Sequence, residues 1–129
     1  MATRREARER ALSLAYECEQ RDVSVEQVLA DLPVAPDPYA TQLAEGAESH
    51  HHEIDALLRK YSEHWALERM PVIDRALLRI GVYELAYVPD VPTAAAITEA
   101  VELAKQYSTK DSGRFVNALL SRIAEEVRA

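Results

Sequence analysis

The sequence has a single cysteine, Cys18, so no disulfide can form within the chain. A lone cysteine on an apolar helical face is usually a small buried hydrophobe, and we therefore expect no redox role for it. Glycine is scarce too, with three in 129 residues, whereas alanine, leucine, glutamate and arginine fill long stretches. These residues favour helix, and the β-branched and aromatic residues that a sheet requires are few. The composition therefore predicts an all-α fold.

Long hydrophobic runs are also missing. The longest uncharged run, residues 91–98, is far shorter than the roughly 20 apolar residues that cross a bilayer. The first ten residues contain four arginines and two glutamates, and they lack the apolar stretch of a secretory signal. We therefore expect a cytoplasmic protein with no membrane segment. Its length suits a single domain over residues 1–129.

Motifs of catalysis and metal binding are missing as well. The sequence has no glycine-rich phosphate loop and no nucleophile elbow. Residues 48–53 include three consecutive histidines, but consecutive residues on a helix point about 100° apart and cannot converge on one ion. We expect no enzyme, no metal and no cofactor, although distant carboxylates that met in a cleft could still perform acid/base catalysis.

The net charge of −7 is distributed unevenly along the chain. Residues 1–10 and residues 105–129 each carry +2, whereas residues 11–104 carry −11. An acidic body with two basic ends suggests a local site for a polyanion on a surface that otherwise repels one. The alternative is that these short charged ends are simply solvated.

Apolar residues at helical spacing predict six helices. They cover residues 4–20, 25–32, 39–61, 72–87, 97–107 and 114–127. The third is expected to be one long helix, and the fourth, which is apolar almost all round, is expected to be central. A hydroxyl and an acid three residues apart, Ser108 and Asp111, predict a variant of the capping box for the last helix.

The most informative segment is residues 105–117, where one helix ends and the next begins after a polar turn. Phe115, the only phenylalanine, lies there among Lys110, Asp111 and Arg114. An aromatic ring beside cations and a helix N-terminus suits single-stranded RNA, because the ring can stack on a base while charges and N–H groups contact phosphates. The alternative is that Phe115 packs back onto the core.

A second basic group lies at the start of the first helix. Arg4, Arg5 and Arg8 share a broad face of its first turn, and guanidinium groups suit phosphate contacts better than ammonium groups do. The alternative is a frayed terminus.

Three segments together form a specific pattern. They are residues 4–16 (RREARERALSLAY), residues 65–85 with IDRALLRIGVYEL, and residues 90–117 with DVP, EAVELAK and DSGRFVN. In this order and at this spacing, the chain closely resembles the NusB family of bacterial transcription antitermination factors. The resemblance covers nearly the whole chain. It implies a compact all-helical fold of about six to seven helices in two small bundles.

The resemblance also implies a function and its residues. Family members bind the boxA element of ribosomal RNA leaders together with NusE, a small-subunit ribosomal protein, and join the RNA polymerase elongation complex through other Nus factors. Matching positions place six residues at the RNA: Arg4, Arg5, Arg8, Asp111, Arg114 and Phe115. Lys110, the cationic neighbour of this segment, is expected to contact phosphate beside them. Tyr16 and Asp74 fall on the surface that faces NusE. That surface lies in the acidic middle of the chain, which suits a basic ribosomal protein.

Two departures from the family pattern bear on this interpretation. Ala118 stands where the family usually has glycine, and Glu6 and Glu9 interrupt the first arginines, which should weaken the attraction for phosphate. Two other functions stay open. One is a helical protein-interaction module, such as a homodimer that hides its basic ends. The other is an RNA-binding accessory domain for an enzyme that modifies ribosomal RNA.

Overall fold

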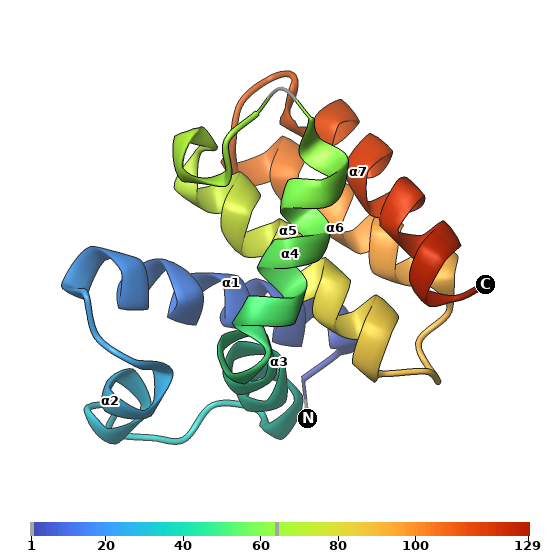
Figure 1. The fold of residues 1–129 in the computed structure, drawn as a ribbon. Helices are drawn as coiled ribbons and strands as arrows, with labels where there is room; N and C mark the ends of the chain where they lie inside the picture. Colours follow the sequence, from blue (N-terminus) through green and yellow to red (C-terminus); the bar gives the residue numbers. More distant parts are fainter. Residues whose placement is uncertain (1, 64) are drawn as a thin grey trace.

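The computed structural model describes residues 2–63 and 65–129, and within these ranges the chain forms seven α-helices and one short 3-10 helix, without any strand. The elements, shown in Figure 1, are α1 (Arg4–Arg21), α2 (Val25–Ala30), α3 (Pro38–Ser49), α4 (His51–Ser62), η1 (Leu67–Arg69), α5 (Val72–Tyr87), α6 (Thr93–Tyr107) and α7 (Ser112–Val127). The predicted all-α class is confirmed. Within the described ranges, none of the helices has the length and apolarity of a membrane span.

Local signals set the starts of the first three helices. A capping box opens α1: the Thr3 hydroxyl accepts from the Glu6 N–H at 3.1 Å, and the Glu6 carboxylate accepts from the Thr3 N–H at 2.9 Å. The side chain of Ser24 caps α2 in a similar way. Asp37 caps α3, and Pro38 at its first position needs no hydrogen-bond partner for a backbone N–H.

The long helix expected over residues 39–61 is instead two helices, α3 and α4, so this prediction was wrong. The break lies at His50, where φ is −106° and ψ is 20°. The His50 N–H still donates to Gly46, and the Ile54 N–H donates to the His50 carbonyl. The apolar residues keep their helical spacing through the break, although the direction of the chain changes there (Figure 1). Periodicity alone cannot reveal such a change.

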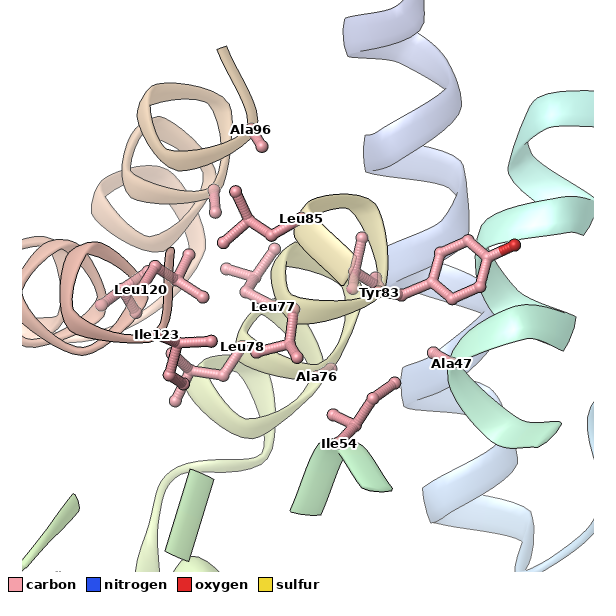
Figure 2. Close-up of a cluster of buried hydrophobic side chains, with 14 of the residues drawn as sticks. Ala47, Ile54, Ala76, Leu77, Leu78, Tyr83, Leu85, Ala96, Leu120 and Ile123 are labelled. Atoms are coloured by element: carbon pink, nitrogen blue, oxygen red, sulfur yellow. The ribbon is translucent and has the colours of Figure 1, made fainter. Parts of the chain in front are cut away.

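Helix α5 is central, as its apolar surface predicts. On one side its Leu77 and Leu85 face the buried side chains of α6 and α7, including Leu120 and Ile123 (Figure 2). On the other side Tyr83 points toward α3 and α1 (Figure 2). Contacts between elements group α1, α2 and α3 together and group α4 with α5, α6 and α7. Two small helical bundles therefore meet on α5.

A buried ion pair joins the two bundles. Arg8 of α1 donates from Nε and Nη2 to the Glu84 carboxylate of α5, at 2.8 and 2.9 Å, and the two side chains are 7 % and 1 % exposed. The Tyr39 hydroxyl of α3 donates to the same carboxylate at 2.5 Å. Burial alone would lower the pKa of Arg8, but the hydrogen bonds and charge of Glu84 outweigh burial and raise it. The pair therefore ties three helices together at one point.

Beside this ion pair, Tyr83 of α5 packs directly on Gly46 of α3. A Cβ atom at position 46 would lie 2.2 Å from the Tyr83 ring, far inside van der Waals contact. Only glycine therefore allows the two helices to approach this closely.

The end of α5 is closed by a residue from the far end of the sequence. The Arg128 guanidinium donates to the carbonyls of Leu85 at 2.9 Å, Val88 at 2.9 Å and Glu84 at 3.1 Å. The last carbonyls of a helix have no partner within the helix, so this side chain satisfies them. Arg128 is one of the basic residues in 105–129 that suggested a polyanion site, but its guanidinium instead binds backbone carbonyls of this protein.

Candidate nucleic-acid interface

The polar turn between α6 and α7, residues 108–111, is fixed by Asp74 at the start of α5. Asp74 is 3 % exposed, and its carboxylate accepts hydrogen bonds from the hydroxyls of Ser108 and Ser112, the latter at 2.8 Å. The Thr109 N–H donates to the Ser112 hydroxyl at 3.2 Å and closes the turn. The N-terminus of α7 is therefore held in place by the central helix.

This arrangement differs from two expectations. Asp111 occupies the N-cap position of α7, but its side chain accepts no capping hydrogen bond from the described residues, and the hydroxyl of Ser112 organises the turn instead. The predicted capping box is therefore wrong. Asp74, expected on a surface facing a protein partner, lies beneath the turn with its carboxylate occupied by two serines.

Phe115 lies in the first turn of α7 and is half-buried. Its ring packs against the core and also meets the ring of Trp65, with the ring centroids 6.4 Å apart and the planes at 65°. This contact brings Trp65, which precedes η1, to the start of α7. The two interpretations of Phe115 are therefore compatible, because the ring is anchored on the core and also reaches the surface.

Three cations surround this turn, and all are exposed: Lys105, Lys110 and Arg114. Among the residues that the structure describes, neither Lys110 nor Arg114 forms an ion pair with a carboxylate. The stem of Lys105 lies on Gly113, where an added Cβ would come within 2.9 Å of Cγ. Sequence reasoning did not assign Lys105 to the site, although Lys105 begins the segment it singled out.

The arginines of α1 point to different places. Arg8 is buried against Glu84, so its guanidinium is not presented to a ligand on the surface. Arg5 is exposed and donates from Nε and Nη2 to the Glu99 carboxylate of α6, at 2.9 and 2.8 Å. These hydrogen bonds raise the pKa of Arg5 and lower that of Glu99. The side chain of Arg5 therefore reaches from α1 to the surface of α6, whereas that of Arg8 does not.

Arg4 lies near the beginning of α6 instead. Its guanidinium is 4.1 Å from the centroid of the Tyr39 ring and 3.6 Å from a carboxylate oxygen of Asp90. Helix α6 has 15 residues, so its two ends lie roughly 22 Å apart at 1.5 Å per residue. A ligand that touched both Arg4 and Phe115 would have to run the length of α6.

Arg5 and the turn lie on one continuous surface. Arg5 and Lys105 line the same hollow of about 330 Å³, together with Glu102, Leu103 and Gln106. Because Lys105 also contacts Gly113, this hollow connects the start of α1 with the start of α7. The fold therefore brings Arg5, from the basic residues 1–10, next to Lys105, from the basic residues 105–129.

A second hollow lies beside Tyr16, which is 42 % exposed. Its volume is about 390 Å³, and the other lining residues are Glu9, Leu12, Ser13, Ile73 and Tyr107. The Tyr107 hydroxyl donates to the Glu9 carboxylate across it. Tyr107 directly precedes the α6–α7 turn, so this hollow lies next to that turn.

The histidine run does not form a metal site. His50 is turned toward Tyr87, with ring centroids 4.0 Å apart, while His51 and His52 are exposed. Over residues 2–63 and 65–129, no three or more His, Cys, Asp or Glu side chains come together in a way that could hold an ion.

Comparison with known proteins assigns the chain to a family. The model of the NusB family matches residues 5–125. The chain belongs to the NusB family. The resemblance noted in the sequence is thereby confirmed, and the seven helices in two bundles agree with the NusB structures described next.

Relatives match the chain along nearly its full length. The transcription antitermination protein NusB of Kineococcus radiotolerans is 49 % identical over 129 residues, covering 97 % of this chain and 95 % of the relative. The Salinispora arenicola protein of the same name is 48 % identical over 132 residues, covering 97 % of each. The solved structure of T. maritima NusB superposes with a TM-score of 0.86 at 38 % identity, covering 97 % of this chain and 92 % of that one.

A further solved structure holds the antitermination factors NusB and NusE in complex with dsRNA. Its matching chain is 28 % identical and superposes with a TM-score of 0.80, covering 95 % of this chain and 96 % of that one.

Proposed function

We propose that the protein is a transcription antitermination factor that binds boxA-type single-stranded RNA of ribosomal RNA leaders together with NusE. The observation that carries this proposal is the half-buried Phe115 ring at the start of α7, beside Lys105, Lys110 and Arg114. Such a ring offers a face to one base, while the cations contact the flanking phosphates. Family membership supports RNA as the ligand, because a NusB relative was solved with NusE and dsRNA, and the exposed aromatic ring is what favours a single strand here.

The proposed RNA surface follows α6 from the start of α1 to the start of α7. Arg5, Lys105, Lys110 and Arg114 supply positive charge for phosphates along it. Asp111 is exposed and would repel a phosphate, so we assign its carboxylate to accept hydrogen bonds from a base.

Two arginines of the first helix, Arg4 and Arg8, are not part of this proposed RNA surface. Arg4 would contact the RNA only if the bound segment reached the beginning of α6. Arg8 has no direct contact and instead fixes α1 on α5.

The proposed NusE surface is the hollow beside Tyr16. Its apolar lining suits a side chain of the partner, and the acidic character of the middle of the chain suits a basic ribosomal protein. Because this hollow adjoins the turn at Tyr107, bound NusE could contact the same RNA. In this proposal the protein acts in the cytoplasm by binding rather than by catalysis, and it joins the elongating polymerase through NusE and other Nus factors.

The test is binding of a labelled boxA-type single-stranded RNA against a scrambled strand and against a duplex of the boxA sequence. Each RNA is measured with and without NusE at two salt concentrations. We expect preference for the boxA strand, tighter binding with NusE, and affinity that falls as salt rises because phosphate contacts release counterions. Equal or absent binding in every condition would instead indicate a helical protein-interaction module.

Substitution of Phe115 gives the residue-level prediction of this proposal. Phe115→Ala should weaken RNA binding by about 1–3 kcal/mol through loss of one stacked base. Because the ring also packs on the core, Phe115→Leu is the matched variant: it keeps apolar contact and removes the aromatic face. A lowered melting temperature with unchanged RNA affinity in both variants would show that Phe115 serves only the core.

A further inference from the structure

We infer that Trp65 is a second base-stacking side chain, which receives a nucleotide adjacent to the one on Phe115 and favours single-stranded over double-stranded RNA. The inference rests on the proposed function, since it adds a residue and a selectivity to the same surface. It follows from four features of the segment after α4: the exposure of Trp65, the way its backbone is held, the angle between the two rings, and the nearby charge.

Trp65 is the only tryptophan in the chain, and it is 57 % exposed. A tryptophan side chain offers a large apolar area for burial, so leaving most of it in water forfeits stabilisation that the core could provide. Among the described residues, the exposed large hydrophobic side chains also include Tyr16, Val34, Tyr87 and Tyr107. Within that part of the chain, only Trp65 pairs its ring with Phe115.

The position of Trp65 is fixed by its backbone rather than by burial of its ring. The Trp65 N–H donates to the Ser62 carbonyl at 3.1 Å, and the Ser62 hydroxyl donates to the Trp65 carbonyl at 2.9 Å. Arg122 of α7 donates to the Tyr61 carbonyl at 3.2 Å and to the Glu63 carboxylate at 3.1 Å. The backbone that carries the exposed ring is therefore ordered before any ligand arrives, which lowers the entropic cost of binding.

The angle between the rings selects the form of RNA. The planes of Trp65 and Phe115 are inclined at 65°, so two bases stacked one on each ring could not be parallel. Bases in a duplex are parallel and paired, and they cannot use both rings at once. Unpaired nucleotides can splay apart and turn between the two rings, as bases in single-stranded RNA commonly do on aromatic side chains.

Positive charge flanks the aromatic pair on both sides. Arg114 directly precedes Phe115, and Arg122 lies two helical turns further along α7, next to the segment that holds Trp65. Arg122 pairs with Glu63 through Nη2, but both side chains are about half exposed and such pairs are weak, so a phosphate can share this guanidinium while Nη1 keeps its hydrogen bond to the Tyr61 carbonyl. This charge favours a polyanionic ligand over an apolar protein segment at the two rings.

The intrinsic fluorescence of the protein provides the direct test, because all tryptophan emission comes from Trp65. Titration with boxA-type single-stranded RNA should quench the emission with the same midpoint as the labelled-RNA assay. The duplex of the same sequence should quench it far less.

Affinity of variants provides the second test. Trp65→Ala and Trp65→Leu should each weaken binding by roughly fivefold to a hundredfold, corresponding to one stacked base. Trp65→Phe should stay within about threefold of the original protein because it keeps an aromatic face. The matched control is Tyr87→Ala. It removes an exposed aromatic side chain at the C-terminal end of α5, whereas Trp65 precedes the N-terminal end of that helix, and it should leave the affinity unchanged.

The outcomes separate this inference from the proposed function. If the boxA strand binds and Phe115→Leu weakens it, but the Trp65 variants bind normally and the emission does not change, then the inference is wrong and the proposed function stands. If the unsubstituted protein binds no RNA, the proposed function fails and the inference fails with it. If Trp65→Leu and Trp65→Phe weaken binding equally, the ring acts through packing and not through stacking.

Discussion

In the proposed complex, Glu99 would compete with RNA for Arg5. Its carboxylate holds the Arg5 guanidinium through two hydrogen bonds, and Arg5 must leave this partner, or share it, to contact a phosphate. Arg5 is largely exposed, so the pair contributes little to stability and can be broken at small cost. The same carboxylate also repels a phosphate that approaches along α6. Glu99 therefore limits the affinity of the proposed RNA surface.

Glu99→Gln should raise the affinity for boxA-type RNA by about twofold to fivefold at low salt, because it removes one like charge and weakens the hold on Arg5. The effect should shrink as salt is raised. Glu53→Gln makes the same change in net charge on an exposed position of α4, and it should have little effect. An equal gain in both variants would show that only the total charge matters.

At the scale of elements, the turn between α6 and α7 connects the core with the proposed RNA surface. Asp74 of α5 binds Ser108 and Ser112 on either side of this turn, and α7 begins directly after it. The orientation of Phe115 therefore depends on a carboxylate that lies beneath the surface. Asp74 is a positioning residue in this arrangement.

Asp74→Ala should lower the free energy of unfolding by about 1–3 kcal/mol, because it leaves buried hydroxyls without their acceptor. It should also weaken RNA binding by the folded protein, since the start of α7 is no longer held. Asp74→Asn keeps one acceptor oxygen and should show smaller losses. Thermal unfolding and RNA titration well below the melting temperature measure the two effects. Normal RNA affinity in a destabilised Asp74→Ala protein would contradict the positioning role.

The sequence predicted most helices because each is a local pattern. Apolar spacing predicted the boundaries of α1 and α5 within a residue or so of those observed. The break at His50 escaped prediction because the apolar spacing continues across it. Whether a charged or aromatic side chain is buried depends on residues far away in the sequence. Arg8 was for this reason expected at RNA, and the exposure of Trp65 was not foreseen.

At the scale of the whole molecule, two bundles share one central helix. Arg8, Glu84 and Tyr39 join the bundles by charge and hydrogen bonds, and Gly46 allows the close contact with Tyr83. The proposed RNA surface includes residues from both ends of the sequence, so it exists only when the bundles are docked. Stability of the junction and RNA binding should therefore be linked.

Arg8→Ala should destabilise the protein by about 3–5 kcal/mol, because it leaves the buried Glu84 carboxylate without its positive partner. Arg10→Ala, an exposed arginine in the same helix, should change stability by no more than about 0.5 kcal/mol. Denaturant unfolding followed by circular dichroism measures both. Unchanged stability with lost RNA affinity in Arg8→Ala would show instead that Arg8 contacts RNA directly.

The ion pair between Arg8 and Glu84 also has a consequence for biosynthesis. The two residues are 76 positions apart in the sequence. At about 5–20 residues per second, the ribosome makes Glu84 roughly 4–15 s after Arg8. During that interval the nascent first helix has a cationic side chain whose native partner does not yet exist. The amino-terminal bundle therefore cannot complete its folding early in translation, and final docking must wait for the second half of the polypeptide.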